Sequence, residues 1–312
     1  MKLALSAIMP SPVKLPDCTI WVASDTGVFL MAGLFEIVGL AFDGAIHPIW
    51  KTSDEEIAYA MKGYYDTRLT EKLYDDVALD GIDGFCLLEI NEYHKIDKPN
   101  GSNALMNVAK NYGLFGQQLP VRAHDTILSF ASKEIRIIAP KSTGTDVLHS
   151  VKTKGKLPVA TTLHPQQNLI MYGTNDGQLY GQYFEENSFT KTVKIGKVPN
   201  TCSQLAFNEQ GDRFYVCGTG FLHIFNYHND TFSLRASLST AARSFVLVET
   251  YLILNKGMHG VEVWHIENEP RRVTSLEIPF AIDKMEYLWS VRTLLLTSAT
   301  TQQVALVRCD LK

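Results

Sequence analysis

The chain has 312 residues, of which 46% are hydrophobic, and it carries a formal net charge of −4. It therefore has no basic excess to neutralise phosphates, which argues against general nucleic-acid binding. Its most apolar stretch, residues 28–42, contains Glu36 and is shorter than the roughly 20 residues of a membrane-spanning helix. These properties favour a soluble, cytoplasmic protein with a sizeable apolar core.

The N-terminal part of the chain predicts one isolated strand and one hairpin. Residues 3–9, LALSAIM, form an apolar run that ends before Pro10. Residues 19–33, TIWVASDTGVFLMAG, contain two apolar runs around a polar turn with a glycine, which is the pattern of a β-hairpin. The strand at residues 3–9 has no sequence neighbour to pair with, so a partner from elsewhere in the chain is expected.

An acidic segment follows this hairpin. Residues 54–92 contain eleven acidic residues and three basic ones, which gives this segment a charge of −8. The spacing of Ser53 and Glu56 is that of a capping box and predicts the start of a short helix. Residues 103–113, with Asn103 at the start and Gly113 at the end, predict a second short helix.

Hairpins recur along the remaining sequence. Each reads as a strand, a tight turn and a second strand, and they span residues 126–140, 163–184, 206–227, 251–266 and 292–308. The intervals are 42, 45, 37 and 42 residues between equivalent positions, which are Ala131, Gly173, Gly218, Asn255 and Thr297. Residues 85–96 add a further strand and turn at Glu89, and residues 19–33 add the hairpin at Ala23.

This spacing predicts an all-β fold, a single seven-bladed β-propeller over residues 1–312, because four-stranded blades recur at about 40–50 residues. The interval from Ala23 to Glu89 is 66 residues, and we assign its surplus to an acidic helical insertion at residues 45–80. An eighth blade is the alternative. The last hairpin lacks an outer strand, so we expect residues 3–9 to supply it and to close the ring through the two ends of the chain.

Two segments resemble the WD-repeat and YVTN families of β-propellers. Residues 207–219, FNEQGDRFYVCGT, are similar to the turn and central strand of a blade, and residues 261–266, VEVWHI, to the next strand. Trp264 is followed by His265 rather than aspartate, and no Gly-His pair opens a blade, so the hydrogen-bonded tetrad of WD repeats is absent. The resemblance implies a scaffold that binds peptides or domains on one face or in a central channel.

Common signatures of enzymes are missing from the sequence. It contains no G-x-S-x-G elbow, phosphate-binding loop or dinucleotide fingerprint. The nine histidines are dispersed and the five cysteines form no C-x-x-C pair, so we expect reduced thiols, no metal site and no cofactor. A non-catalytic protein is favoured, and a lactonase-type hydrolase that uses the central channel is the alternative.

The acidic segment is the candidate binding site. Its carboxylates attract a basic partner, and its tyrosines are of the type that anchors interfaces. The candidate residues are Asp54, Glu55, Glu56, Tyr59, Tyr64, Tyr65, Asp66, Asp75 and Asp76. A solvated helix whose acids only maintain solubility is the competing interpretation.

The expected function is therefore to hold a protein partner, as a scaffold, an adaptor or an inhibitor. The partner is expected to be basic if the acidic segment forms the interface. An immunity protein that neutralises a cognate toxin is one alternative, in which dense carboxylates imitate phosphates. We expect a monomer or a subunit of a hetero-complex, without direct contact to nucleic acid or membrane.

Overall fold

The computed structural model describes residues 1–15, 19–23, 28–33, 35–51, 53, 121–123, 126–131, 134–141, 144–153 and 158–310. These residues form β-strands, with one 3₁₀ turn at Gly257–His259. None of the described segments is a helix of the length and apolarity that crossing a membrane requires. The chain divides into two compact units, Met1–Asn107 with Val248–Lys312, and Val108–Leu247, and the division falls inside strand β18 (Ser244–Val248), whose last residue alone belongs to the first unit.

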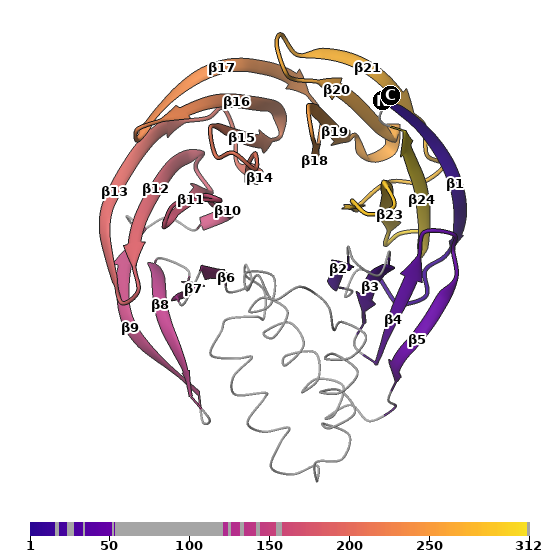
Figure 1. The fold of residues 1–312 in the computed structure, drawn as a ribbon, viewed down its shortest axis with the longest axis horizontal. Helices are drawn as coiled ribbons and strands as arrows, with labels where there is room; N and C mark the ends of the chain where they lie inside the picture. The colour runs from indigo at the N-terminus through magenta and orange to yellow at the C-terminus, as the bar shows by residue number, and fades with distance from the viewer. Residues whose placement is uncertain are drawn as a thin grey trace. The chain divides into compact units, whose positions relative to one another are not determined.

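The strands of the first unit belong to three antiparallel four-stranded sheets (Figure 1). One sheet consists of β2 (Thr19–Ala23), β3 (Val28–Ala32), β4 (Glu36–Ala41) and β5 (Ile46–Lys51). The next consists of β18 (Ser244–Val248), β19 (Tyr251–Asn255), β20 (Val261–His265) and β21 (Arg271–Leu276). The third has the order β22 (Lys284–Leu288), β23 (Thr293–Ser298), β24 (Gln303–Asp310) and β1 (Lys2–Pro10).

The second unit contains three more sheets, each in the order of the sequence. The first of them consists of β6 (Val121–Ala123), β7 (Thr126–Ala131), β8 (Glu134–Lys141) and β9 (Gly144–Lys152). The second consists of β10 (Pro158–Leu163), β11 (Leu169–Thr174), β12 (Gln178–Glu185) and β13 (Ser188–Lys197). The third consists of β14 (Cys202–Phe207), β15 (Arg213–Gly218), β16 (Gly220–His228) and β17 (Thr231–Thr240).

The apolar runs of the sequence become the second strands of the sheets. Every residue of β11 (LIMYGT) and of β23 (TLLLTS) is buried, whereas most residues of the outer strand β13 are partly or fully exposed. A strand that is covered on both faces needs continuous apolar sequence, and an outer strand does not. The core of the first unit accordingly lies between two sheets, where Leu295 and Leu306 pack with Phe29 and Leu40.

The predicted pairing of the two ends of the chain is confirmed. Strand β1 is antiparallel to β24, from Lys2 opposite Asp310 to Pro10 opposite Gln303, with an irregularity between Leu5 and Ala7 (Figure 1). Beyond the strand, the side-chain amide of Gln302 donates to the Leu15 carbonyl at 2.8 Å, and its oxygen accepts from the Leu15 amide at 3.0 Å. The N-terminal segment thus completes the last sheet as its outer strand.

The other sequence predictions have mixed outcomes. The hairpins at residues 19–33 and 126–308 are confirmed, but Ala23 lies in the first strand of its sheet, whereas the later positions of the series lie in second strands. In the first sheet, the position equivalent to those in the later second strands is therefore at the end of β3. The interval from there to Glu89 exceeds the blade spacing by fewer residues than predicted. Within the predicted insertion at residues 45–80, Ile46–Lys51 form β5. Both short helices, Glu89 and the rest of the insertion lie outside the described residues, so the helical insertion and the count of seven blades stay predictions.

Candidate functional site

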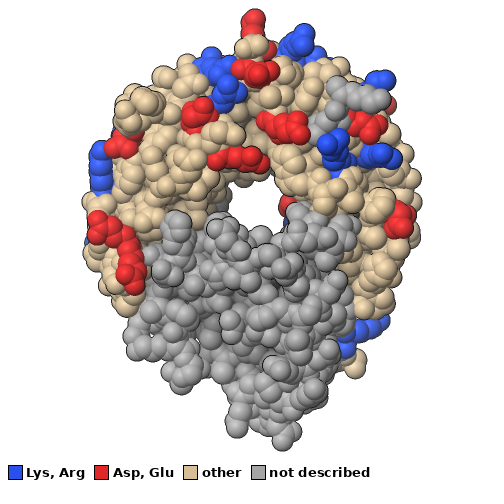
Figure 2. Space-filling model, viewed as in Figure 1, with Lys and Arg blue, Asp and Glu red and all other residues tan. Residues whose placement is uncertain are grey.

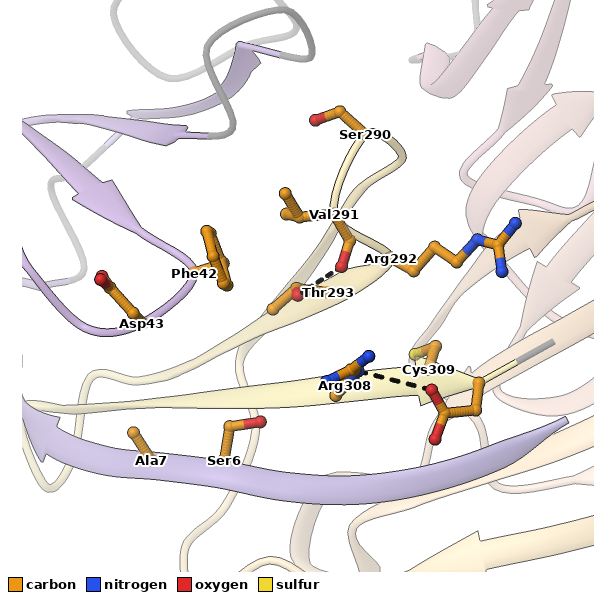
Figure 3. Close-up of a pocket in the computed structure, with 11 residues that line it drawn as sticks. Ser6, Ala7, Phe42, Asp43, Ser290, Val291, Arg292, Thr293, Arg308 and Cys309 are labelled. Atoms are coloured by element: carbon orange, nitrogen blue, oxygen red, sulfur yellow. Dashed lines mark hydrogen bonds and ion pairs between the residues drawn. The ribbon is translucent and has the colours of Figure 1, made fainter.

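A hollow of about 570 Å³ opens on the surface of the first unit (Figure 3). Strand β1, the end of β24, the β4–β5 turn and the β22–β23 turn surround it. The residues that line it are Ser6, Ala7, Phe42, Asp43, Ser290, Val291, Arg292, Thr293, Arg308, Cys309 and Asp310. It therefore brings together three segments that lie far apart in the sequence.

The β22–β23 turn, Trp289–Arg292, holds Arg292 in an unusual backbone conformation. Its φ is 49°, in the left-handed region that disfavours side chains larger than glycine. The Arg292 amide donates to the Trp289 carbonyl at 3.2 Å, and the Arg292 carbonyl accepts from the Cys309 amide at 2.8 Å. The Thr293 hydroxyl donates to the Val291 carbonyl at 3.0 Å. These hydrogen bonds fix the turn although one residue is strained.

The charged groups of the hollow are only partly paired. Arg308 contacts Asp310 at 3.4 Å, with 70% of the Arg308 side chain exposed. Asp43 accepts a hydrogen bond from the Ala45 amide at 2.9 Å. Within the described residues, the exposed side chain of Arg292 has neither a hydrogen bond nor an ion pair, but its charge acts on Tyr287, and in Figure 3 it points away from Phe42. The hollow thus presents a guanidinium group that can accept an anionic partner.

Aromatic side chains lie beside these charges. Phe42 in the β4–β5 turn is 50% exposed, and Trp289 in the β22–β23 turn is 41% exposed. The Trp289 ring contacts the buried Tyr287 ring edge-on, with centroids 5.0 Å apart. This contact favours one orientation of the Trp289 ring. The hollow therefore combines the exposed Phe42 with two arginines and two aspartates, and Trp289 lies next to it in the β22–β23 turn.

The corresponding place in the second unit is filled by five side chains that satisfy one another: Gln167, Tyr183, Lys191, Tyr227 and Asp230. We call this set the closed corner. The Tyr227 hydroxyl donates to Gln167 at 2.8 Å and lies 2.8 Å from the Tyr183 hydroxyl, which itself donates to Asp230. Lys191 pairs with the other Asp230 oxygen at 2.7 Å. The lysine bond and the tyrosine bond lower the pKa of Asp230.

The innermost strand β22 carries a carboxyl group with altered acidity. Burial raises the pKa of Glu286 to about 7, and the charge of Lys284 opposes this shift. A carboxyl that titrates near neutral pH can act as an acid or a base. In the described part of the chain, no group of three or more His, Cys, Asp or Glu residues is arranged to hold a metal ion.

The nine candidate residues of the acidic segment all lie outside the described residues, so the interface predicted there stays a prediction. The hollow was missed by the sequence analysis. One signal was available: a hairpin turn that ends in arginine, whereas the β14–β15 turn has Gly211 at φ 75° and ends in Asp212. The Gly211 amide donates to the Asn208 carbonyl at 3.0 Å, as the Arg292 amide does to Trp289.

Comparison with known proteins identifies the fold. No protein-family model and no curated protein matches the chain. Among solved structures, the Cps50 (Swd1) β-propeller domain of Myceliophteria thermophila aligns with 60% of this chain and 67% of its own, at 14% identity and a TM-score of 0.50. A putative 6-phosphogluconolactonase from Bacteroides fragilis aligns with 61% of this chain and 65% of its own, just under two thirds, at 13% identity and a TM-score of 0.52. The chain therefore has a β-propeller fold, and the resemblance inferred from its hairpins is confirmed.

Proposed function

We propose that this chain is a non-catalytic β-propeller that holds a protein partner inside the cell, with the hollow of the first unit as one contact surface. The observation that carries the proposal is the combination of exposed Phe42 with Arg292 and Arg308 around one opening, next to the exposed Trp289 of the turn that carries Arg292. Aromatic residues and arginine supply most of the binding energy in protein interfaces. The buried thiols of Cys202, Cys217 and Cys309 are unpaired, in keeping with a reducing compartment.

The charges of the surface support recognition by individual groups. On the face shown in Figure 2, basic and acidic side chains are interspersed over the described residues. A partner that binds such a surface is selected by contacts with individual side chains, because a surface of mixed charge does not attract one charge sign throughout. Side chains at the hollow can provide such contacts, and the β22–β23 turn that carries some of them is held by backbone hydrogen bonds.

A photo-crosslinking experiment tests this proposal. Benzoylphenylalanine at position 289 should form a covalent adduct with one identified protein in the source cell, and Phe42→Ser should abolish the adduct. The same probe at Leu234, which is 57% exposed on β17 of the other unit, is the matched control. Equal adducts at both positions, or none at 289, would remove the hollow from the proposal.

The acidic segment is proposed as a second surface for a basic partner. Neutralising Asp54, Glu55, Glu56, Asp75 and Asp76 should weaken capture of that partner most strongly at low salt, where charge attraction is least screened. Capture that is unchanged in the neutralised variant would show that the segment serves solubility alone.

A lactonase-type hydrolase is the second candidate, and Glu286 is the observation that favours it. Its pKa of about 7 suits general base catalysis at neutral pH. Hydrolysis of gluconolactone above the spontaneous rate, reduced at least roughly 100-fold in Glu286→Gln, would support this candidate. A rate equal to the spontaneous one would discard it.

A further inference from the structure

We infer that the hollow binds an acidic, extended segment of the partner, with one carboxylate on Arg292, a second on Arg308 and an apolar side chain against Phe42. This inference deepens the proposed function and rests on it. We choose a protein segment as the ligand because the hollow presents charged groups next to an exposed aromatic side chain.

The first argument is the state of the two arginines. Arg292 projects from a turn that is held by backbone hydrogen bonds, and among the described residues its guanidinium makes no hydrogen bond or ion pair, although its charge acts on Tyr287. Over the same residues, Arg308 pairs only with Asp310, at 3.4 Å and largely in solvent. An exposed pair of this kind contributes little, so a carboxylate from a partner can replace Asp310 at small cost. Guanidinium groups bind carboxylates with two parallel hydrogen bonds, which also fixes direction.

The second argument is the backbone of Arg292. Of the described non-glycine residues with positive φ, Arg292 alone lines the hollow. In the β14–β15 and β18–β19 turns this place belongs to Asp212 and Thr250, whose carbonyls accept from the third strand as that of Arg292 does, and neither has a positive φ. A strained residue where glycine would serve the backbone better points to a role of its side chain.

The third argument is the shape of the lining. Ser6, Ala7 and Ser290 are small and leave room between the arginines and Phe42. Strand β1 is an outer strand whose regular pairing breaks between Leu5 and Ala7, at the floor of the hollow. An extended segment can therefore lie along this floor and place alternate side chains on Phe42 and on the arginines.

Selection from random dodecapeptides displayed on phage tests the inference. The full chain should enrich peptides that carry Asp or Glu beside an aromatic or aliphatic residue. A synthetic copy of the most enriched peptide, followed by fluorescence anisotropy, should bind Arg292→Gly and Arg308→Gln at least about fivefold more weakly. Asp310→Asn, which releases Arg308, should bind it about twofold or more tightly. Raising the salt concentration should weaken the binding.

Arg292→Gly is the decisive variant because glycine suits the left-handed turn, so a loss of binding cannot be ascribed to misfolding. Asn229→Gly is the matched control: it replaces another exposed residue at positive φ, 45°, in the second unit, that does not line the hollow. Enrichment of non-acidic peptides, no enrichment, or equal binding by Arg292→Gly and Asn229→Gly would overturn the inference. A crosslinked partner at position 289 combined with any of these results would leave the proposed function standing, whereas absence of that adduct would count against the function itself.

Discussion

The hollow of the first unit and the closed corner of the second occupy the same place in the repeat, but their side chains are used differently. Each lies between the first turn of one sheet and the last turn of the sheet that follows it. In the closed corner, Asp230 receives hydrogen bonds from Tyr183 and Lys191. In the hollow, as far as the described residues go, Asp43 accepts only from the Ala45 amide, and the Arg292 side chain makes no hydrogen bond or ion pair.

The backbone hydrogen bonds show how close this correspondence is. The Phe184 amide donates to the Asn168 carbonyl at 3.0 Å, and the Cys309 amide donates to the Arg292 carbonyl at 2.8 Å. Tyr183 and Arg308 directly precede these two amides, so they occupy corresponding positions on third strands. Tyr183 is hydrogen-bonded to its neighbours, whereas Arg308 is exposed. Mutually satisfied polar groups stabilise a fold, and unsatisfied ones at the same position are available to a ligand.

The largest effect is expected from removing the strand that forms the floor of the hollow. Deletion of residues 1–10 exposes the edge of β24 and uncovers Leu306 and Val307. Full burial of each such side chain contributes about 2 kcal/mol, so their partial exposure should cost up to about 4 kcal/mol. Thermal unfolding should show a large fall in the midpoint, whereas Ile8→Ser, at an exposed position of β1, should be nearly neutral. A truncated chain as stable as the full chain would contradict the role of β1.

The next effect distinguishes the two places directly. Tyr227→Phe removes the hydroxyl that links Gln167, Tyr183 and Asp230 in the closed corner, and should cost roughly 1–2 kcal/mol. Arg308→Gln in the hollow should change stability by less than about 0.5 kcal/mol. Urea unfolding of the two variants, with unchanged slopes, measures this difference. Equal losses would show that the hollow is also a structural contact.

The hairpins could be predicted from the sequence, whereas the hollow could not. Residues 169–185 contain a continuous apolar run, the polar turn Asn-Asp-Gly and a second apolar run, so both strands are fixed locally. The first sheet misled the prediction because TIWVA and VFLMA are equally apolar, and nothing local shows which of them is the second strand. Phe42, Arg292 and Arg308 come from separate segments, which are brought together by the β23–β24 pairing and by the packing of two sheets against each other.

A smaller, pH-dependent effect should be confined to the closed corner. Lys191 and Tyr183 lower the pKa of Asp230 in the folded chain relative to its ordinary value of about 3.9. At pH values above the ordinary pKa, the ionised carboxylate of Asp230 therefore stabilises the folded chain. This contribution is lost as the pH falls through the lowered pKa. Between pH 5 and pH 3 the thermal midpoint of the wild type should fall further than that of Asp230→Asn. Parallel falls in the two proteins would show that Asp230 contributes nothing.

The smallest effect has the opposite sign. Arg292→Gly relieves the positive φ, and should leave the stability unchanged or raise it by up to about 1 kcal/mol. Gly211→Ala is the converse control, because an added methyl group would clash with the His164 ring in the folded chain, and should be destabilising. Urea midpoints compare both variants with the wild type. A clear loss of stability in Arg292→Gly would mean that the arginine supports the turn itself.

The pairing of β1 with β24 also sets a condition on biosynthesis. Lys2 is synthesised 308 residues before its partner Asp310. At about 5–20 residues per second, strand β1 waits roughly 15 to 60 s before the strand that pairs with it exists. Its apolar residues are exposed to other nascent chains and to chaperones for that time, so this sheet can be completed only after β24 has left the ribosome.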